Sequence, residues 1–313
     1  MKRYFLSLPL FLVAGLTLLR GDVQPVAAQG VNGEDREIRV ATFNLYNYGV
    51  MDRMFEGQWR SQYPKPEEEK TALRNIIREV RPEVLAIQEI GGEAFLEELR
   101  NDLREEGIDY PYGDVVQAVD EVRKIGFLAK IEPVEVRAWT ELDFAYFGER
   151  ELVKRGLLEV VFPVGPEETW SLYVVHLKSK WTERPDDPQA EQKRVREAEA
   201  VRNHILASRD PAEDFFLIAG DVNDLLHSSA LRRLRIRGEV QISEPLPARD
   251  RDGLTWTQRW EKAGLYSRID YLLVSPAMRP WWTEDSAVVY DGPDWAKASD
   301  HRMVYADFRL PSE

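Results

Sequence analysis

The stretch FFLIAGDVND, residues 215–224, combines an apolar run with polar residues that follow it directly. The run bears on the fold, and the polar residues bear on the chemistry. The apolar run, 215–219, is typical of a strand buried on both faces of a sheet. Gly220 and Asp221 follow the run directly, and Asn223 comes two residues later. Polar side chains therefore meet the end of a buried strand. Glycine, aspartate and asparagine are also common turn residues, so the stretch alone is compatible with a simple turn.

The same arrangement recurs along the chain. In four apolar runs (VATF, VLAIQ, LYVV and FFLIAG) the polar residue follows the run, and in two (YLLV and MVYADF) it precedes the run. If the last two strands run antiparallel to the first four, all of these side chains lie at one edge of the sheet system. The polar residues concerned are Asn44, Glu89, His176, Asp221, Asp270, Asp300 and His301.

These residue types together indicate phosphate ester chemistry. Carboxylate and amide oxygens are hard ligands suited to Mg²⁺, Mn²⁺ or Ca²⁺. A group of buried acids without a cation would repel itself. Two histidines add groups that titrate near neutrality and bind or protonate an oxyanion. Each residue alone has a simpler structural explanation, such as a turn, a core histidine or an ion-pair partner, and the hypothesis depends on their joint placement.

Strands and helices are expected to alternate along the whole chain, which favours one α/β domain over residues 38–313. Three helices are predicted: one after Pro66 that ends at Pro82, one over 93–103, and one from Pro188 to about Ala207. Polar loops at 56–64, 181–188 and 241–254 are long enough to surround a site. The predicted strands are 38–43, 84–87, 125–129, 157–162, 171–175, 215–219, 269–274 and 303–308.

Composition excludes several classes of protein. The 313 residues are 43% hydrophobic and 11% aromatic, which excludes a disordered chain. The absence of cysteine excludes a disulfide scaffold and a cysteine-ligated zinc site. The net charge of -13 argues against a protein that holds nucleic acid mainly by bulk positive charge. It does not argue against one that cuts nucleic acid.

Residues 1–28 are predicted to be a secretory signal peptide. Lys2 and Arg3 precede an apolar run over 5–19, and Val26-Ala27-Ala28 is a small-residue cleavage pattern. An uncleaved membrane anchor is the alternative. Cleavage would remove three positive charges and one negative charge, so the net charge would become -15. We therefore expect a secreted or periplasmic protein without membrane association after cleavage, with 29–37 as a short segment before the domain.

Six segments together resemble the endonuclease/exonuclease/phosphatase superfamily, which includes pancreatic-type deoxyribonucleases, neutral sphingomyelinases and inositol polyphosphate 5-phosphatases. They are VATFNLYNYG, VLAIQEI, VVHLKSK, LIAGDVND, SRIDYLLVSP and ASDHRMV, in the family's order, and they cover the chain from about Ile38 to Phe308. The resemblance implies a four-layer α/β sandwich, in which two packed mixed sheets are flanked by helices. It also implies metal-dependent phosphoester hydrolysis at one sheet edge.

The resemblance implies a role for each matching residue. Glu89 corresponds to the main metal carboxylate and Asn44 to its partner in the metal site, with Mg²⁺ as the expected ion and Mn²⁺ or Ca²⁺ as alternatives. Asp300 corresponds to a second acid beside the metal. Asp221 corresponds to the acid that orients or deprotonates the attacking water. Asp221 and Asp300 stay open between ligand and base, because one-metal and two-metal schemes both exist.

The remaining catalytic roles fall on the amide and the histidines. Asn223 corresponds to the amide that holds water or phosphate, and His301 to the imidazole that contacts the scissile phosphate, oriented by Asp270. His176 corresponds to the second histidine, which contacts phosphate or assists the leaving oxygen. Pancreatic-type deoxyribonucleases pair this histidine with a glutamate. The counterpart region here, 120–124, reads DEVRK, so we do not expect that pairing and expect Arg123 to face phosphate.

The segment HLKSKW, 176–181, places Lys178, Lys180 and Trp181 just after a catalytic candidate. Phosphate contact and base stacking are one interpretation, and a solvated loop is the other. The segment looks most like secreted bacterial nucleases, so we expect an endonuclease with nucleic acid as its substrate and no stable protein partner. The alternatives are a phosphodiesterase or phosphatase for lipid headgroups or small phosphate esters, and an inactive binding module.

Overall fold

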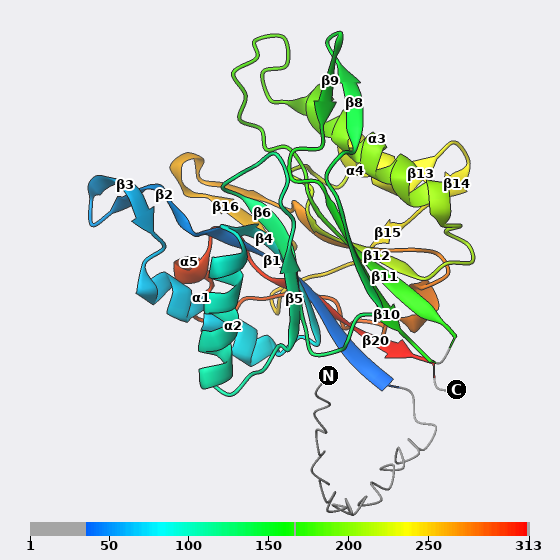
Figure 1. Cartoon of the computed structure of the whole chain (residues 1–313), viewed down its shortest axis with the longest axis horizontal. Helices are drawn as coiled ribbons and strands as arrows, with labels where there is room; N and C mark the ends of the chain where they lie inside the picture. The colour runs from blue at the N-terminus through cyan, green and yellow to red at the C-terminus, as the bar shows by residue number, and fades with distance from the viewer. Residues whose placement is uncertain (1–35, 166, 312–313) are drawn as a thin grey trace, which may run out of the picture. The chain divides into compact units, whose positions relative to one another are not determined.

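The computed structural model describes residues 36–165 and 167–311, so the predicted signal peptide lies outside the described part. Two six-stranded mixed sheets pack face to face, and helices cover the outer face of each (Figure 1). The predicted four-layer α/β sandwich is confirmed. Among the helices of the described ranges, none has both the length and the apolar character that a bilayer crossing requires.

The first sheet has the strand order β19-β20-β1-β4-β6-β5. β1 runs parallel to β4 and antiparallel to β20. The first and last long strands of the domain are therefore neighbours. The strands are β1 (Arg36–Tyr48), β4 (Val84–Ile90), β5 (Tyr112–Val115), β6 (Lys124–Ala129), β19 (Val288–Val289) and β20 (Val304–Leu310).

The second sheet has the order β15-β18-β12-β11-β10-β7. β11 and β12 are parallel, and β18 is antiparallel to β12. The last long strand of each sheet is thus antiparallel to the strands that carry Asn44, Glu89, His176 and Asp221, as the sequence pattern predicted. The strands are β7 (Glu135–Trp139), β10 (Leu157–Pro163), β11 (Thr169–His176), β12 (Phe216–Asp221), β15 (Glu244–Pro245) and β18 (Asp270–Val274).

The core is divided by the sheets into three apolar layers. Successive residues of a central strand serve different layers, because side chains alternate across a strand. Val40 packs between the sheets, whereas Ala41 packs under the helices on the first sheet. Both faces are buried, which explains why these strands read as continuous apolar runs rather than as alternating ones.

The helices lie where the apolar periodicity predicted them. α1 (Glu67–Val80) begins after Pro66 and ends at Arg81, which adopts the left-handed conformation. α1 and α2 (Glu93–Glu105) cover the first sheet. α3 (Glu191–Ser208) covers the second sheet together with the short α4 (Ser229–Arg235). A further short helix, α5 (Trp295–Ala298), and two 3₁₀ turns, Glu261–Ala263 and Arg279–Trp281, complete the helical segments of the described residues.

Two-stranded hairpins project from the sandwich and were mostly not predicted. Residues 56–64, expected as a loop, form the tip and second strand of the β2–β3 hairpin, because the two segments pair with each other rather than with a sheet. Trp260 is 56% exposed on β16. The hairpins are β2 (Val50–Phe55) with β3 (Gln58–Pro64), β8 (Asp143–Tyr146) with β9 (Glu149–Leu152), β13 (Ile236–Arg237) with β14 (Val240–Gln241), and β16 (Gln258–Trp260) with β17 (Leu265–Ser267).

Candidate active site

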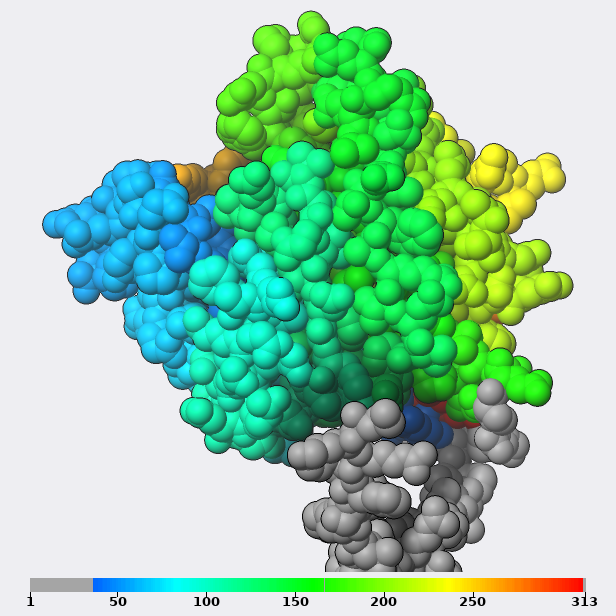
Figure 2. Space-filling view, viewed as in Figure 1, coloured from blue at the N-terminus to red at the C-terminus, as the bar shows by residue number. Residues whose placement is uncertain are grey.

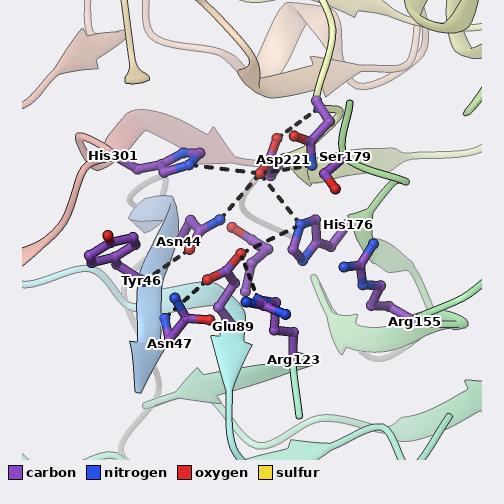
Figure 3. A network of polar contacts seen from close by, with 12 residues as sticks. Asn44, Tyr46, Asn47, Glu89, Arg123, Arg155, His176, Ser179, Asp221 and His301 are labelled. Carbon is purple, nitrogen blue, oxygen red and sulfur yellow. Dashed lines mark hydrogen bonds and ion pairs between the residues drawn. The ribbon is translucent and has the colours of Figure 1, made fainter. Parts of the chain in front are cut away.

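Strand direction brings the predicted polar residues to one edge of the two sheets (Figure 3). His176 ends β11, Asp221 ends β12 and Asp270 begins β18, and these three residues are register neighbours across the second sheet. Asn44 on β1 and Glu89 on β4 approach from the first sheet. Asp300 and His301 lie just before β20, in the segment that leads back to this edge.

The Asp221 carboxylate is at the centre of the site. Asn44 Nδ2 donates a hydrogen bond of 3.2 Å to Oδ2, and the Asn223 backbone N–H donates one of 2.7 Å to Oδ1. Nε2 of His176 lies 3.5 Å from Oδ2, and Nε2 of His301 lies 3.9 Å from the same atom. Burial and the neighbouring Asp270 carboxylate raise the pKa of Asp221 to about 8. An acid with such a pKa can exchange a proton near neutral pH.

His301 is held by the carboxylate of Asp270. Nδ1 of His301 lies 2.9 Å from Asp270 Oδ2, which leaves Nε2 directed at the site. Burial alone would lower the pKa of His301, but the Asp270 and Asp300 carboxylates outweigh it and hold the pKa well above its usual value. His301 is therefore a cation that can bind or protonate a phosphate oxygen.

The backbone around Asp270 and His301 is also fixed by hydroxyl groups. Thr257 Oγ1 accepts hydrogen bonds from the backbone N–H groups of Ile269 and Asp270, at 3.0 and 3.1 Å. The His301 N–H donates to Ser299 Oγ, whose hydroxyl in turn donates to the Asn44 carbonyl. Asn44 and His301 are thereby joined across the edge of the first sheet.

Glu89 reaches the site through a β-bulge. The register of β4 shifts between Gln88 and Ile90, and Glu89 has a φ of 62°, a conformation that is uncommon for a residue other than glycine. A bulge of this kind re-aims a side chain at the edge of a sheet. The Asn47 N–H donates a 3.0 Å hydrogen bond to Glu89 Oε2, and Arg123 Nε lies 3.8 Å from Oε1.

His176 lacks a carboxylate partner of the deoxyribonuclease kind. Its Nδ1 is buried and forms no hydrogen bond with any of the described residues. The Asp120 carboxylate, from the segment expected to be the counterpart, is instead 3.0 Å from Arg155 Nε. Burial and the nearby Arg155 guanidinium lower the pKa of His176 well below its usual value. His176 is therefore a neutral imidazole beside the cationic His301.

The predicted substrate-binding residues differ in their surroundings. Arg123 is about a third exposed and faces Glu89 at the rim of the site. Lys180 is exposed. Lys178 is mostly buried, and its ammonium group donates hydrogen bonds to the carbonyl oxygens of Ser179 and Trp181. Lys178 therefore holds its own loop in this structure, and a direct phosphate contact by Lys178 stays a prediction.

The donor set fits a divalent cation. Glu89, Asn44 and Asp300 present hard oxygen ligands, and Asp300 Oδ1 is buried without a hydrogen-bond partner among the described residues. Asp221, Asp270 and His301 also offer ligand atoms that lie within 4.8 Å of one another. A cation in this group would relieve the repulsion between the carboxylates.

Sequence reasoning missed the residues that support the site. Asn47 and Ser299 lie inside the NLYNYG and ASDH motifs, so proximity to a motif was a usable signal. Arg155 was detectable only as a charged residue two positions before a continuous apolar strand. Thr257 left no signal, because its role depends on the turn that brings it beside Asp270.

The model of one family matches residues 41–301, under the description Endonuclease/Exonuclease/phosphatase family. The match contains every member of the site described above. The chain belongs to this family. Its fold is the family's four-layer sandwich, and the protein is a metal-dependent phosphoesterase with a buried Asp/Asp/His group that is able to hold a metal.

Several solved structures share this fold. The human Nocturnin catalytic domain with bound sulfate is 17% identical with a TM-score of 0.61, covering 89% of this chain and 97% of that one. A Bacteroides vulgatus family member is 16% identical with a TM-score of 0.60, covering 88% and 99%. Sphingomyelinase C from Streptomyces griseocarneus is 17% identical with a TM-score of 0.57, covering 88% and 100%. No curated protein sequence matches the chain.

Proposed function

We propose that this phosphoesterase is an endonuclease that hydrolyses nucleic-acid phosphodiester bonds with Mg²⁺, Mn²⁺ or Ca²⁺ as its cofactor. The observation that carries the proposal is the pair of histidines directed at Asp221 Oδ2, with His176 Nε2 at 3.5 Å and His301 Nε2 at 3.9 Å. One imidazole is neutral and the other is cationic. Arg123 at the rim of the site and the exposed Lys180, four residues after His176, supply positive charge for the phosphates that flank the cleaved bond.

The proposed reaction is attack of water on the phosphodiester. Asp221 orients the water and accepts its proton, while Asn223 holds the same water or a phosphate oxygen. His301 donates a hydrogen bond from Nε2 to a phosphate oxygen, and His176 contacts the phosphate or the leaving oxygen. A cation held by Glu89, Asn44 and Asp300 would supply Lewis-acid stabilisation of the phosphate charge when bound.

Hydrolysis of a lipid headgroup is the second candidate. Trp59 and Met54, on the β2–β3 hairpin, are 66% and 59% exposed, as expected for side chains that enter a lipid surface. The adjacent Trp281 and Trp282 do not offer such a surface, because Trp282 is buried and Trp281 packs against the core. One structural relative is named sphingomyelinase C.

A substrate panel tests the proposal. The protein without residues 1–28 is incubated with plasmid DNA, single-stranded DNA, RNA, sphingomyelin vesicles and a nitrophenyl phosphate monoester, each with Mg²⁺ and with EDTA. We expect internal cleavage of nucleic acid that EDTA abolishes. Hydrolysis of sphingomyelin or of the monoester with intact nucleic acids would refute the endonuclease and support the second candidate.

We also propose that the protein is exported to the periplasm or the medium after cleavage near Ala28. The support is the charged start, the apolar run and the small-residue pattern of the first 28 residues. Amino-terminal sequencing of the protein from fractionated cells tests this. A first residue close to 29 in the exported fraction is expected, and an intact first segment in the membrane fraction would contradict it.

A further inference from the structure

A second concave surface lies beside the active site and is not used by the reaction above. It is a groove of about 490 Å³ between the β8–β9 hairpin and the loop that follows β11. Both segments stand beyond the end of the sheets, above α3 (Figures 1 and 2). Lys178 lines the groove and comes two residues after His176. The groove therefore adjoins the active site.

Trp181 presents a free aromatic face to this groove. Its side chain is 68% exposed, and no aromatic side chain of the described ranges stacks on it. The loop that carries Trp181 is held by Lys178. The Lys178 ammonium group donates a hydrogen bond to the Trp181 carbonyl and lies 5.8 Å from the centre of the indole ring. A mostly buried lysine thus fixes the position of an exposed tryptophan. A single exposed aromatic side chain is ordinary on a protein surface. Trp181 differs because Lys178 fixes its position, which favours contact with a ligand.

The groove is positively charged although the chain is acidic. Four cationic side chains line it against two acidic ones, in a chain with a net charge of -13. Lys193 is paired with Glu151, whereas the Lys154 ammonium group is 3.6 Å from its acidic partner Asp120 and 38% exposed. Arg184 packs over the rings of Tyr146 and Phe147, which holds the guanidinium near the rim. The charged lining residues are Lys154, Lys178, Arg184, Lys193, Glu151 and Glu183.

We propose that this groove is a nucleotide subsite in which an unpaired base stacks on Trp181 while Lys154 and Arg184 contact the adjacent phosphate. The proposal rests on the proposed endonuclease function and adds to it a preference for single-stranded nucleic acid. Stacking on an indole face requires a base that is free of its duplex partner. Positive charge beside an exposed aromatic is the combination by which proteins bind single strands without reading their sequence.

Two measurements on the protein without residues 1–28 test the subsite. The first is the Kd of a fluorescein-labelled single-stranded oligonucleotide in EDTA, which prevents turnover, by fluorescence anisotropy. The second is kcat and KM in Mg²⁺ for the same oligonucleotide, for its duplex and for bis-nitrophenyl phosphate, a diester that is too small to reach the groove. The variants are Trp181→Ala, Trp181→Phe, which keeps a stacking face, and Val134→Ala, which shortens a similarly exposed apolar side chain (64%) outside the groove.

We expect Trp181→Ala to raise both the Kd and the KM for the single strand about tenfold. The kcat for bis-nitrophenyl phosphate should stay unchanged, Trp181→Phe should recover most of the lost affinity, and Val134→Ala should behave as wild type. Wild type should also prefer the single strand to the duplex.

The possible failures are distinguishable. Nucleic-acid cleavage with the same Kd and KM in Trp181→Ala would overturn the subsite and leave the endonuclease proposal standing. A wild type that hydrolyses bis-nitrophenyl phosphate but neither binds nor cleaves the oligonucleotide would overturn both. Binding of wild type to zwitterionic lipid vesicles that Trp181→Ala abolishes would show that the groove takes lipid, which also overturns the subsite.

Discussion

The carboxylate of Asp270 decides which nitrogen of His301 faces the substrate. Because Nδ1 is bound to Asp270 at 2.9 Å, Nε2 points toward Asp221 and Asp300, at 3.9 Å from an oxygen of each. The same carboxylate is the largest of the influences that raise the pKa of His301. Orientation and charge of this imidazole therefore depend on one residue that does not itself need to touch the substrate.

We predict that Asp270→Asn lowers kcat by about a hundredfold or more, since an imidazole that is neither oriented nor charged loses its contribution to phosphate binding. The protonated form of His301 is lost as pH rises through its pKa, and the substitution lowers that pKa. The alkaline fall in kcat should therefore move to lower pH. A pH–rate profile measures this, with the exposed Asp252→Asn as the control. An unchanged alkaline limb would contradict the account.

For single residues, the sequence predicted which residues form the site better than it predicted their contacts. The polar residues at the strand ends could be named because each interrupts an apolar run, as Glu89 does after VLAIQ. The bulge that aims Glu89 could not be predicted, because it is produced by register against two neighbouring strands. The pairing of Asp120 with Arg155, which leaves His176 Nδ1 without a partner among the described residues, depends on tertiary packing in the same way.

At the scale of elements, α3 supports the loop that follows His176. Its residue Glu197 is fully buried and accepts backbone N–H bonds from Lys178 at 2.6 Å and Lys154 at 3.1 Å. One helix side chain thus ties together the segments on both sides of the proposed nucleotide groove. The helix predicted from Pro188 to about Ala207 contains Glu197, but the contacts of Glu197 follow only from how the helix packs on the sheet.

We predict that Glu197→Ala lowers the free energy of unfolding by about 2–4 kcal/mol, because two backbone N–H groups lose their acceptor in a buried position. The control is Glu199→Ala on the same helix. The Glu199 carboxylate pairs with Arg196 and Arg233 nearer the surface, so its loss should cost less than about 1 kcal/mol. Urea denaturation compares the two, and equal losses would contradict the role of Glu197.

Elements in the core were predictable and those outside it were not. Buried strands such as β12 and helices such as α1 carry apolar patterns that only packing in a sandwich satisfies. β3 is almost wholly exposed and reads as a polar loop, since its pairing with β2 leaves no buried face to pattern. The hairpins outside the core were therefore mostly missed.

At the scale of the whole molecule, ion pairs inside the sandwich set its response to acid. Burial raises the pKa of Asp120, but Arg155 and backbone N–H donors outweigh it and leave the pKa below the usual value. Hydrogen bonds from Arg209 and Tyr173 lower the pKa of Glu159 in the same way. A carboxyl with a depressed pKa in the folded state stabilises the protein above the pKa of the unfolded chain, about 4. That stabilisation disappears as pH falls through the folded pKa.

We predict that stability is level near neutral pH with respect to these two groups and falls steeply below about pH 4. Asp120→Asn and Glu159→Gln should each lower stability at neutral pH and make the acid fall shallower. Urea midpoints measured from neutral to acid pH test this. An acid limb as steep in both variants as in wild type would show that other groups control acid unfolding.

The chain as a whole is acidic, and the residues of the site account for part of this acidity. Four acids, Glu89, Asp221, Asp270 and Asp300, gather at the site that fits a cation, and the cationic groove beside it offsets the charge where a phosphate would approach. A net charge of -13 is thus compatible with turnover of nucleic acid but not with tight binding through bulk charge.

The most direct test of metal-dependent cleavage at this sheet edge is a plasmid-nicking rate. Wild type without residues 1–28 is measured with Mg²⁺ and with EDTA, beside His301→Ala and Asp221→Ala in Mg²⁺. We predict nicking by wild type that EDTA abolishes, and a loss of at least about a hundredfold in each variant. Nicking that persists in EDTA, or that survives both substitutions, would contradict the account.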